Sequence, residues 1–281
     1  MNASVNESEE LEQEAWKDAF AALEGVSRRR LGLSTERFGR ALVLGAPGVR
    51  HFMLNRVIGF GEDGALSASA ISAHYAGMGV TDYMVHVSPG CERAAAAELC
   101  VAGLVPFHRP WLKLARRSGP LPESPGSIEV ARVDSASAET FAMIIARNFE
   151  LPRATAELWM ALTARSRWYC FLARDAGRAI AAASLFVDGD VGYLQAAATS
   201  AECRGRGAQS ALIAHRLRLA FSLGCRTLYT ETGVAIPGEP NPSERNLLRF
   251  GFKPLAVRQN FVPASVKQRR TLETSVESSS S

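Results

Sequence analysis

Apolar and polar positions alternate along the chain with two different periods, and these predict a mixture of helices and strands. In residues 9–23, Trp16, Phe20 and Leu23 recur at the spacing of one helix face. In residues 81–87 (TDYMVHV) apolar positions alternate with others, as in a half-buried strand. Both periods recur along most of the chain, so the sequence predicts an α/β protein.

The first part of the chain predicts short strands between alanine-rich helices. Glycines separate these segments, and Gly103 stands where a helix C-cap is expected. After the helix at 9–23, the predicted elements are strands and turns in 40–60, a helix at 67–76, a strand at 81–87, a helix at 91–102 and a strand at 110–114.

The second part predicts a hairpin followed by a strand, a helix and a further strand. Asp175, Ala176 and Gly177 form the expected hairpin turn. The predicted elements are a strand at 128–133, helices at 137–149 and 153–162, strands at 168–174, 179–187 and 191–199, a helix after residue 207, a strand at 227–232, a short helix at 243–250 and a final strand region through 261.

Residues 118–127 (SGPLPESPGS) mark the clearest boundary in the sequence. They concentrate proline, glycine and serine between two ordered regions, as linkers do. The 281 residues are enough for two domains. We therefore expect an N-terminal arm at 1–27, a domain at 28–117, the linker at 118–127, a second domain at 128–265 and a disordered tail at 266–281.

Residues 203–223 (CRGRGAQSALIAHRLRLAFSL) place a basic glycine turn at the start of a helix between two strands. The N–H groups of a first helical turn have no intrahelical partners, and the helix dipole favours negative charge there. Gly205 and Gly207 permit close approach of the backbone, while Arg204 and Arg206 add positive charge. This pattern predicts a pocket for a phosphorylated ligand.

Two nucleotide-binding motifs compete for this turn. A P-loop needs a lysine followed by serine or threonine after its last glycine, and the chain has neither there. A dinucleotide fingerprint is closer, with Ser210 in place of its third glycine and Glu231 at the distance of a ribose-binding acid. The antiparallel hairpins before it argue against this motif. An NAD(P)-binding domain stays open as the weaker alternative.

Residues 128–263 resemble the GNAT superfamily of N-acetyltransferases. Arg204 and Gly207 match that family's pyrophosphate loop, while Gln209 stands where a small residue is usual. The order of the elements agrees, and residues 249–252 (RFGF) resemble the ending of the family's last short helix. The resemblance implies an α/β fold with a mixed, mostly antiparallel central sheet flanked by helices.

By this resemblance, the ligand is acetyl-CoA or another acyl-CoA as co-substrate. Its pyrophosphate would bind the loop, its pantetheine arm would pair with the edge of strand 191–199, and two polar side chains of the short helix would contact the pantetheine or a water. The implied cofactor-binding residues are Ala197, Ala198, Thr199, Arg204, Gly205, Arg206, Gly207, Ala208, Gln209, Ser210, Ser243 and Asn246.

The resemblance implies an acyltransferase that moves an acetyl or other acyl group to a primary amine by direct attack in a ternary complex. Glu231 is the carboxylate best placed to accept the proton. Leu247 stands where family members often carry a tyrosine as the acid for the thiolate. A non-catalytic acyl-CoA-binding regulatory module is therefore the alternative.

One internal echo suggests a second unit. The segment from Leu99 (LCVAGLVPFHRPWLKL) is similar to the segment from Leu247 (LLRFGFKPLAVRQNFV), with Gly103 opposite Gly251. Either the similarity is chance, or residues 28–117 are a degenerate GNAT-like unit in tandem with the predicted domain at 128–265.

Composition narrows the function classes. The net charge of +4 is small for this length and does not argue for nucleic acid. The five cysteines lack CxxC spacing and the histidines are isolated, so we expect no metal. No apolar run spans a bilayer and the acidic N-terminus is no secretory signal, so we expect a cytoplasmic protein without membrane contact. Its partner would be a small-molecule or protein amine, and the protein a monomer or homodimer.

Overall fold

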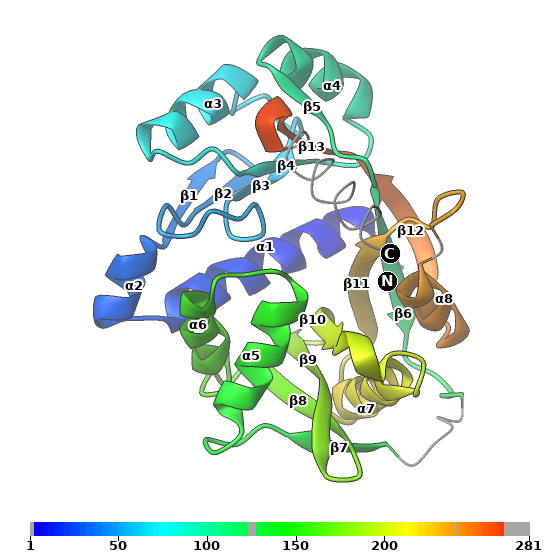
Figure 1. Ribbon diagram of the computed structural model, residues 1–281. Helices are drawn as coiled ribbons and strands as arrows, with labels where there is room; N and C mark the ends of the chain where they lie inside the picture. Colours follow the sequence, from blue (N-terminus) through cyan, green and yellow to red (C-terminus); the bar gives the residue numbers. More distant parts are fainter. Residues whose placement is uncertain (1–2, 123–127, 240, 267–281) are drawn as a thin grey trace. The chain divides into compact units, whose positions relative to one another are not determined.

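The computed structural model describes residues 3–122, 128–239 and 241–266, and it divides into two compact units (Figure 1). Unit 1 combines Met1–Ser27 with Leu112–Ala256, and unit 2 combines Arg28–Trp111 with Val257–Ser281. Each unit therefore draws on two separate parts of the sequence. Half of the predicted linker, 123–127, and the predicted tail beyond residue 266 lie outside the described residues.

The sheet of unit 1 is mixed and mostly antiparallel, as the sequence predicts. Strands β7 to β10 pair antiparallel in sequence order, whereas β10 and β11 pair parallel. This topology confirms the expected fold class and is not the doubly wound parallel sheet of a dinucleotide-binding domain. In spatial order the strands are β12 (Lys253–Arg258), β6 (Trp111–Arg117), β11 (Thr227–Gly233), β10 (Val191–Thr199), β9 (Arg178–Asp188), β8 (Trp168–Asp175) and β7 (Glu129–Arg132).

Helix α7 (Ala208–Ser222) connects β10 to β11 and packs on one face of this sheet. Its Leu212, Ile213 and Leu217 are fully buried in a cluster with side chains of β8 to β11 and of α8. Each such side chain contributes about 1.5–3 kcal/mol through burial. The other helices of unit 1 are α1 (Val5–Ala22), α5 (Ala138–Asn148), α6 (Ala156–Leu162) and α8 (Pro242–Arg249).

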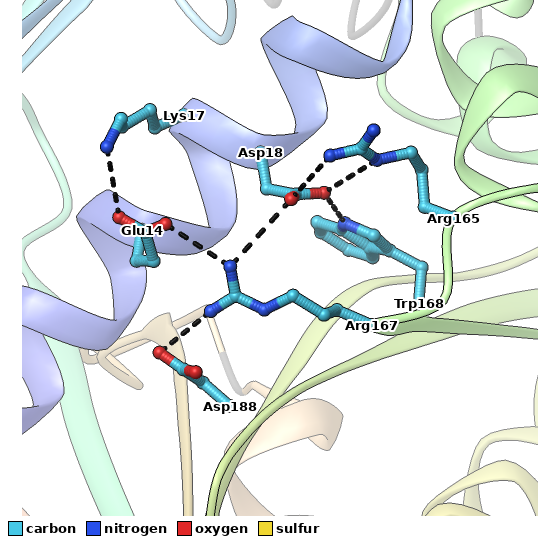
Figure 2. A network of polar contacts seen from close by, with 7 residues as sticks. All are labelled: Glu14, Lys17, Asp18, Arg165, Arg167, Trp168 and Asp188. Atoms are coloured by element: carbon cyan, nitrogen blue, oxygen red, sulfur yellow. Dashed lines mark hydrogen bonds and ion pairs between the residues drawn. The ribbon is translucent and has the colours of Figure 1, made fainter.

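Helix α1 is part of unit 1, although the sequence predicted a separate arm. Figure 2 shows that Asp18 accepts hydrogen bonds from Arg165 Nη2 at 2.7 Å and from Trp168 Nε1 at 2.9 Å. Arg167 bridges Glu14, at 3.2 Å, and Asp188 on β9, at 2.7 Å. These contacts fix α1 to the sheet.

A second buried ion pair joins α1 to β6. Lys113 Nζ lies 2.7 Å from Glu9 Oε1 and 2.8 Å from Glu12 Oε2, and the lysine side chain is fully buried. The cost of removing these charges from water is repaid only in a well-formed geometry, so the pair specifies one docking of α1.

Unit 2 has the strand arrangement of unit 1 without a counterpart of β7. Three strands pair antiparallel in sequence order, the third pairs parallel with the fourth, and helix α3 (Ala68–Gly77) connects these last two. The spatial order is β1 (Ser34–Phe38), β2 (Ala41–Gly45), β3 (Arg56–Phe60), β4 (Met84–Val87), β13 (Asn260–Pro263) and β5 (Leu104–Pro106). Its helices include α4 (Glu92–Val101), and α2 (Gly25–Leu31) crosses the boundary between the units.

The two halves of the sequence exchange one strand each. Strand β6 comes from the first half but lies between β11 and β12 in unit 1, and β13 comes from the end of the chain but lies between β4 and β5 in unit 2. The units of the structure therefore differ from the sequence segments 28–117 and 128–265. The order of elements in the sequence could not show this exchange, because the strands that pair with β6 and β13 are determined by tertiary contacts.

Candidate functional site

The turn before α7 exposes a group of backbone amides. Gly205 and Gly207 have φ values of +79° and +87°, which glycine adopts without the steric cost of a side chain. No side chain caps the helix, and Ala211 N–H is the first to bond back, to Gly207 at 3.0 Å. Within the described residues, the N–H groups of Gly205, Arg206, Gly207, Ala208, Gln209 and Ser210 donate no hydrogen bond.

Positive charge surrounds these amides. Arg204 is exposed beside the turn, and Arg206 pairs with Asp175 of β8 at 3.3 Å. The free amides and the N-terminal end of the helix dipole add partial positive charge. This is the physical form of an anion site at a helix N-terminus, and it places the predicted loop residues together at one point.

A polar cluster joins the first turn of α7 to α8. Gln209 Nε2 donates to Ser243 Oγ, and Asn246 Nδ2 donates to Gln209 Oε1 at 2.7 Å. Gln209 therefore turns its side chain toward α8, away from the amide cradle. The large side chain at this position therefore contacts α8.

Arg249 belongs to the same cluster and was missed at the sequence level. Its Nη2 donates to Ser210 Oγ at 2.6 Å and to Asn246 Oδ1 at 3.3 Å. The spacing of three residues between Asn246 and Arg249, on one face of a polar helix, was the available signal.

The parallel pairing of β10 and β11 stops before the end of β10. The last paired residues are Leu194 and Thr230, and Thr230 Oγ1 donates to the Leu194 carbonyl at 2.9 Å. Beyond this point β10 continues to pair with β9, through Ala198 and Thr199. Among the described pairings, the edge of β10 on the side of β11 is therefore open from residue 195 onward.

Glu231 follows Thr230, the last residue of β11 that pairs with β10. It is half-buried, and strand alternation places it on the same face as Tyr229. Tyr229 donates to the Glu7 carboxylate and accepts from Ser4 N–H at 3.3 Å, so it binds α1 as well as packing in the core. Burial and the hydrogen bond to Glu7 raise the pKa of Tyr229.

Leu247 of α8 stands where family members often carry a tyrosine, and its side chain has no proton to donate to a thiolate. Its side chain is 5% exposed and belongs to the core cluster beneath α7. The described residues contain no group of three or more His, Cys, Asp or Glu side chains arranged to hold a metal ion. None of the helices in the described part of the chain combines the length and apolar character needed to cross a bilayer.

The corresponding helix of unit 2 has a filled N-terminus. Ala70 N–H donates to Ser67 Oγ at 3.2 Å, and Ala68 N–H donates to the Glu98 carboxylate at 2.7 Å. Protein oxygens therefore occupy the position that α7 leaves open, and the preceding turn carries Glu62 and Asp63 in place of arginines. The end of α3 is not built to receive an anion.

Comparison with known proteins identifies the second half of the chain. Residues 137–252 match the model of the acetyltransferase (GNAT) family. This segment contains the loop, the open strand edge and α8, and it is a GNAT acetyltransferase domain. Membership of this family supports acyl transfer as its general chemistry. None of the curated proteins matches the sequence.

Solved structures share the fold over most of the chain. A GCN5-related N-acetyltransferase from Kribbella flavida is 17% identical with a TM-score of 0.59, covering 89% of this chain and 95% of that one. A GCN5-related N-acetyltransferase from Sphaerobacter thermophilus is 16% identical with a TM-score of 0.56, covering 79% of each chain. A functionally unknown conserved protein from Staphylococcus epidermidis is 6% identical with a TM-score of 0.57, covering 86% and 98%.

Proposed function

We propose that the protein is an N-acyltransferase that moves an acetyl or other acyl group from acyl-CoA to a primary amine. The observation that carries this proposal is a pair of features: six unbonded amides at the start of α7, and an open strand edge on β10, the strand that precedes them in the chain. A pyrophosphate needs the first feature, and an extended chain of amides such as pantetheine needs the second.

In this proposal, Arg204 and the amides of residues 206–210 hold the pyrophosphate. The residues Ala197, Ala198 and Thr199 offer backbone groups to the pantetheine arm. Ser243 and Asn246 already bond to Gln209, so we assign them the task of holding α8 against α7 beside that arm.

Acyl-CoA supplies a thioester whose carbonyl carbon accepts the amine. We assign Glu231 the removal of the amine proton, directly or through a water. The new C–N bond forms as the C–S bond breaks, and the thiolate leaves and takes up a proton. Since Leu247 cannot supply that proton, we expect it to come from solvent or from the acceptor amine.

Two experiments test the proposal. Isothermal titration with acetyl-CoA should show binding, and thiol release over a panel of small-molecule amines and peptide N-termini should show turnover with at least one of them. Binding of NADH without binding of CoA would overturn the proposal. We also place the protein in the cytoplasm as a monomer or homodimer.

The buried Leu247 favours one second candidate, an acyl-CoA-binding regulatory module without turnover. Such a module would use the same loop and strand edge but would need no proton donor. Tight binding of acetyl-CoA, with no amine-dependent thiol release across the panel, would favour this candidate over the enzyme.

We further propose that unit 2 is a degenerate GNAT-like unit. Its strand order matches that of unit 1 apart from β7, and Ser67 and Glu98 bind amides at the N-terminus of its α3. Calorimetry should therefore give one acetyl-CoA bound per chain. Two bound per chain would contradict this assignment.

A further inference from the structure

Helix α7 carries a buried arginine that the proposed function has not used. Arg216 is 2% exposed, and its guanidinium donates to three carbonyls: Leu212 at 3.1 Å, Ser184 at 3.0 Å and Gln195 at 3.5 Å. Burial lowers its pKa to about 9. No ion pair to a carboxylate is seen for Arg216 among the described residues, so carbonyls of α7, β9 and β10 are the partners of its guanidinium there.

Two donors converge on the carbonyl of Gln195. Ser184 Oγ donates to it at 3.1 Å, in addition to Arg216. Gln195 is the first residue of β10 beyond its pairing with β11, and the register with β9 shifts directly after it. Ala196 has a φ of +42°, a strained value for a residue with a side chain. The two donors thus bind a β-bulge that lies where the pairing of β10 with β11 ends.

The planarity of the peptide decides where this bulge points. The Gln195 carbonyl is directed toward β9 and α7, and in a trans peptide the following N–H points the opposite way. The Ala196 N–H therefore faces the open edge of β10. Donation to the carbonyl polarises the same peptide and makes that N–H a stronger donor.

The side chain of Gln195 is a second, independent observation at this point. It is 7% exposed, and neither its Nε2 nor its Oε1 has a hydrogen-bond partner among the described residues. A buried amide without partners is costly. Its presence at the bulge indicates a place where a polar ligand supplies the missing partners.

We propose that Arg216 and Ser184 are positioning residues that fix the Gln195–Ala196 peptide against the acyl end of bound acyl-CoA. This inference rests on the proposed function and deepens it. Neither residue touches the ligand; each acts through the backbone of β10.

The test compares acetyl-CoA with its nucleotide part, adenosine 3′-phosphate 5′-diphosphate, by calorimetry on the full chain. Arg216→Met and Ser184→Ala should each weaken acetyl-CoA binding by about tenfold, because each removes one hydrogen bond to the Gln195 carbonyl. Neither substitution should change the affinity for the nucleotide. Arg216→Lys should recover part of the loss. Arg218→Met, an exposed arginine on the same helix, is the matched control and should bind both ligands normally.

The thermal midpoint separates positioning from stability. Arg216→Met removes the cost of burying a charge that has no carboxylate partner and keeps a side chain of similar length, so the variant should stay folded. Unchanged acetyl-CoA affinity in both variants, or equal weakening of both ligands, would overturn the inference alone. A wild-type protein that binds neither ligand would instead overturn the proposed function.

Discussion

At the residue scale, the starts of α7 and α3 differ in whether protein groups already bind their first amides. Both helices connect parallel strands, but Gly207 begins α7 with no capping side chain, whereas Ser67 caps α3 and Glu98 takes a further amide. A cap satisfies the same N–H groups that an anion would bind. The uncapped start of α7 therefore leaves amides available for the anion of the proposed function, and arginines in the preceding turn add positive charge.

Substitution of this turn should abolish ligand binding without unfolding. Arg204→Ala together with Gly207→Glu removes one positive charge and places a carboxylate where the pyrophosphate is expected. Loss of the Arg204 contact, together with repulsion by the new carboxylate, should weaken acetyl-CoA binding by about 100-fold or more. Calorimetry measures the affinity, and circular dichroism checks the fold.

The matched control for this change is Arg153→Ala with Gly189→Glu. Arg153 is highly exposed, and Gly189 has a φ of +57° in a surface turn with open space around it. The control introduces similar charge and backbone strain away from the loop. Equal affinity in the two double variants would remove the loop from the proposed site.

Gly251 shows how one residue secures the end of α8. It has a φ of +79°, and a Cβ there would collide with Nη1 of Arg116, which donates to the Phe250 carbonyl. Gly251→Ala should cost about 1–2 kcal/mol for the left-handed backbone, and more for the displaced guanidinium. The measurement is the shift in thermal midpoint.

Gly224→Ala is the control for Gly251→Ala. Gly224 also follows a helix of unit 1, with a φ of +92°, but a Cβ there meets no atom within 4 Å. It should show the backbone strain alone. If both variants lose the same stability, the contact with Arg116 contributes nothing measurable.

At the element scale, α1 shows a helix whose polar face is buried. Its acids bind Lys113, Arg165 and Arg167, and Trp16 packs edge-to-face on Trp159 at 6.3 Å. From the sequence pattern alone, acidic residues on a helix are predicted to face solvent, because their basic partners cannot be identified. The partners lie about 100 or more residues away, so only the folded chain reveals them.

This docking predicts a dependence of stability on acid pH. Burial acts to raise the pKa of Asp18, but hydrogen bonds from Arg165 and Trp168 and the nearby arginine charges outweigh it and lower the pKa. The stabilising contribution is therefore present above the unfolded pKa of about 4, and it is lost as the pH falls through the lower folded value.

Urea unfolding between pH 7 and pH 3 measures this effect. The wild type should lose stability below about pH 4, and Asp18→Asn should be less stable at pH 7 and flatter in this range. Glu139→Gln, which breaks a highly exposed pair with Arg153, is the control and should leave the profile unchanged. An identical pH profile for Asp18→Asn would contradict the role of Asp18.

At the scale of the whole molecule, the exchanged strands make each unit depend on both halves of the sequence. Strand β6 fills the position between β11 and β12, and β13 fills the equivalent position between β4 and β5. The echo between the segments at Leu99 and Leu247 now has a structural counterpart. In both, a helix ends at a glycine with positive φ and two strands follow.

Cutting the chain at the predicted linker should therefore not release a folded domain. A polypeptide of residues 118–281 lacks α1 and β6, so β11 would present an unpaired edge. We expect it to be insoluble or unfolded when produced alone. Co-production with residues 1–117 should restore a soluble pair, measured by solubility and circular dichroism.

Much of the second half was predictable because its signals are local. Helical periodicity located α5 and α7, the Asp175–Gly177 turn located the hairpin, and the basic glycine turn marked the start of α7. Arg216, Arg249 and Gln195 were not singled out as candidates. Their roles depend on contacts with Ser184, Ser210 and the end of a strand pairing, none of which has a local pattern.

By itself, the sequence determined the fold class, the glycine turn at the start of α7 and the order of the elements around it. These depend on side-chain period, glycine positions and charge within short stretches. Only the tertiary structure decided the strand exchange, the docking of α1 and the β10 bulge held by Arg216. These depend on pairs of residues far apart in sequence, where burial and hydrogen bonding choose one partner among many.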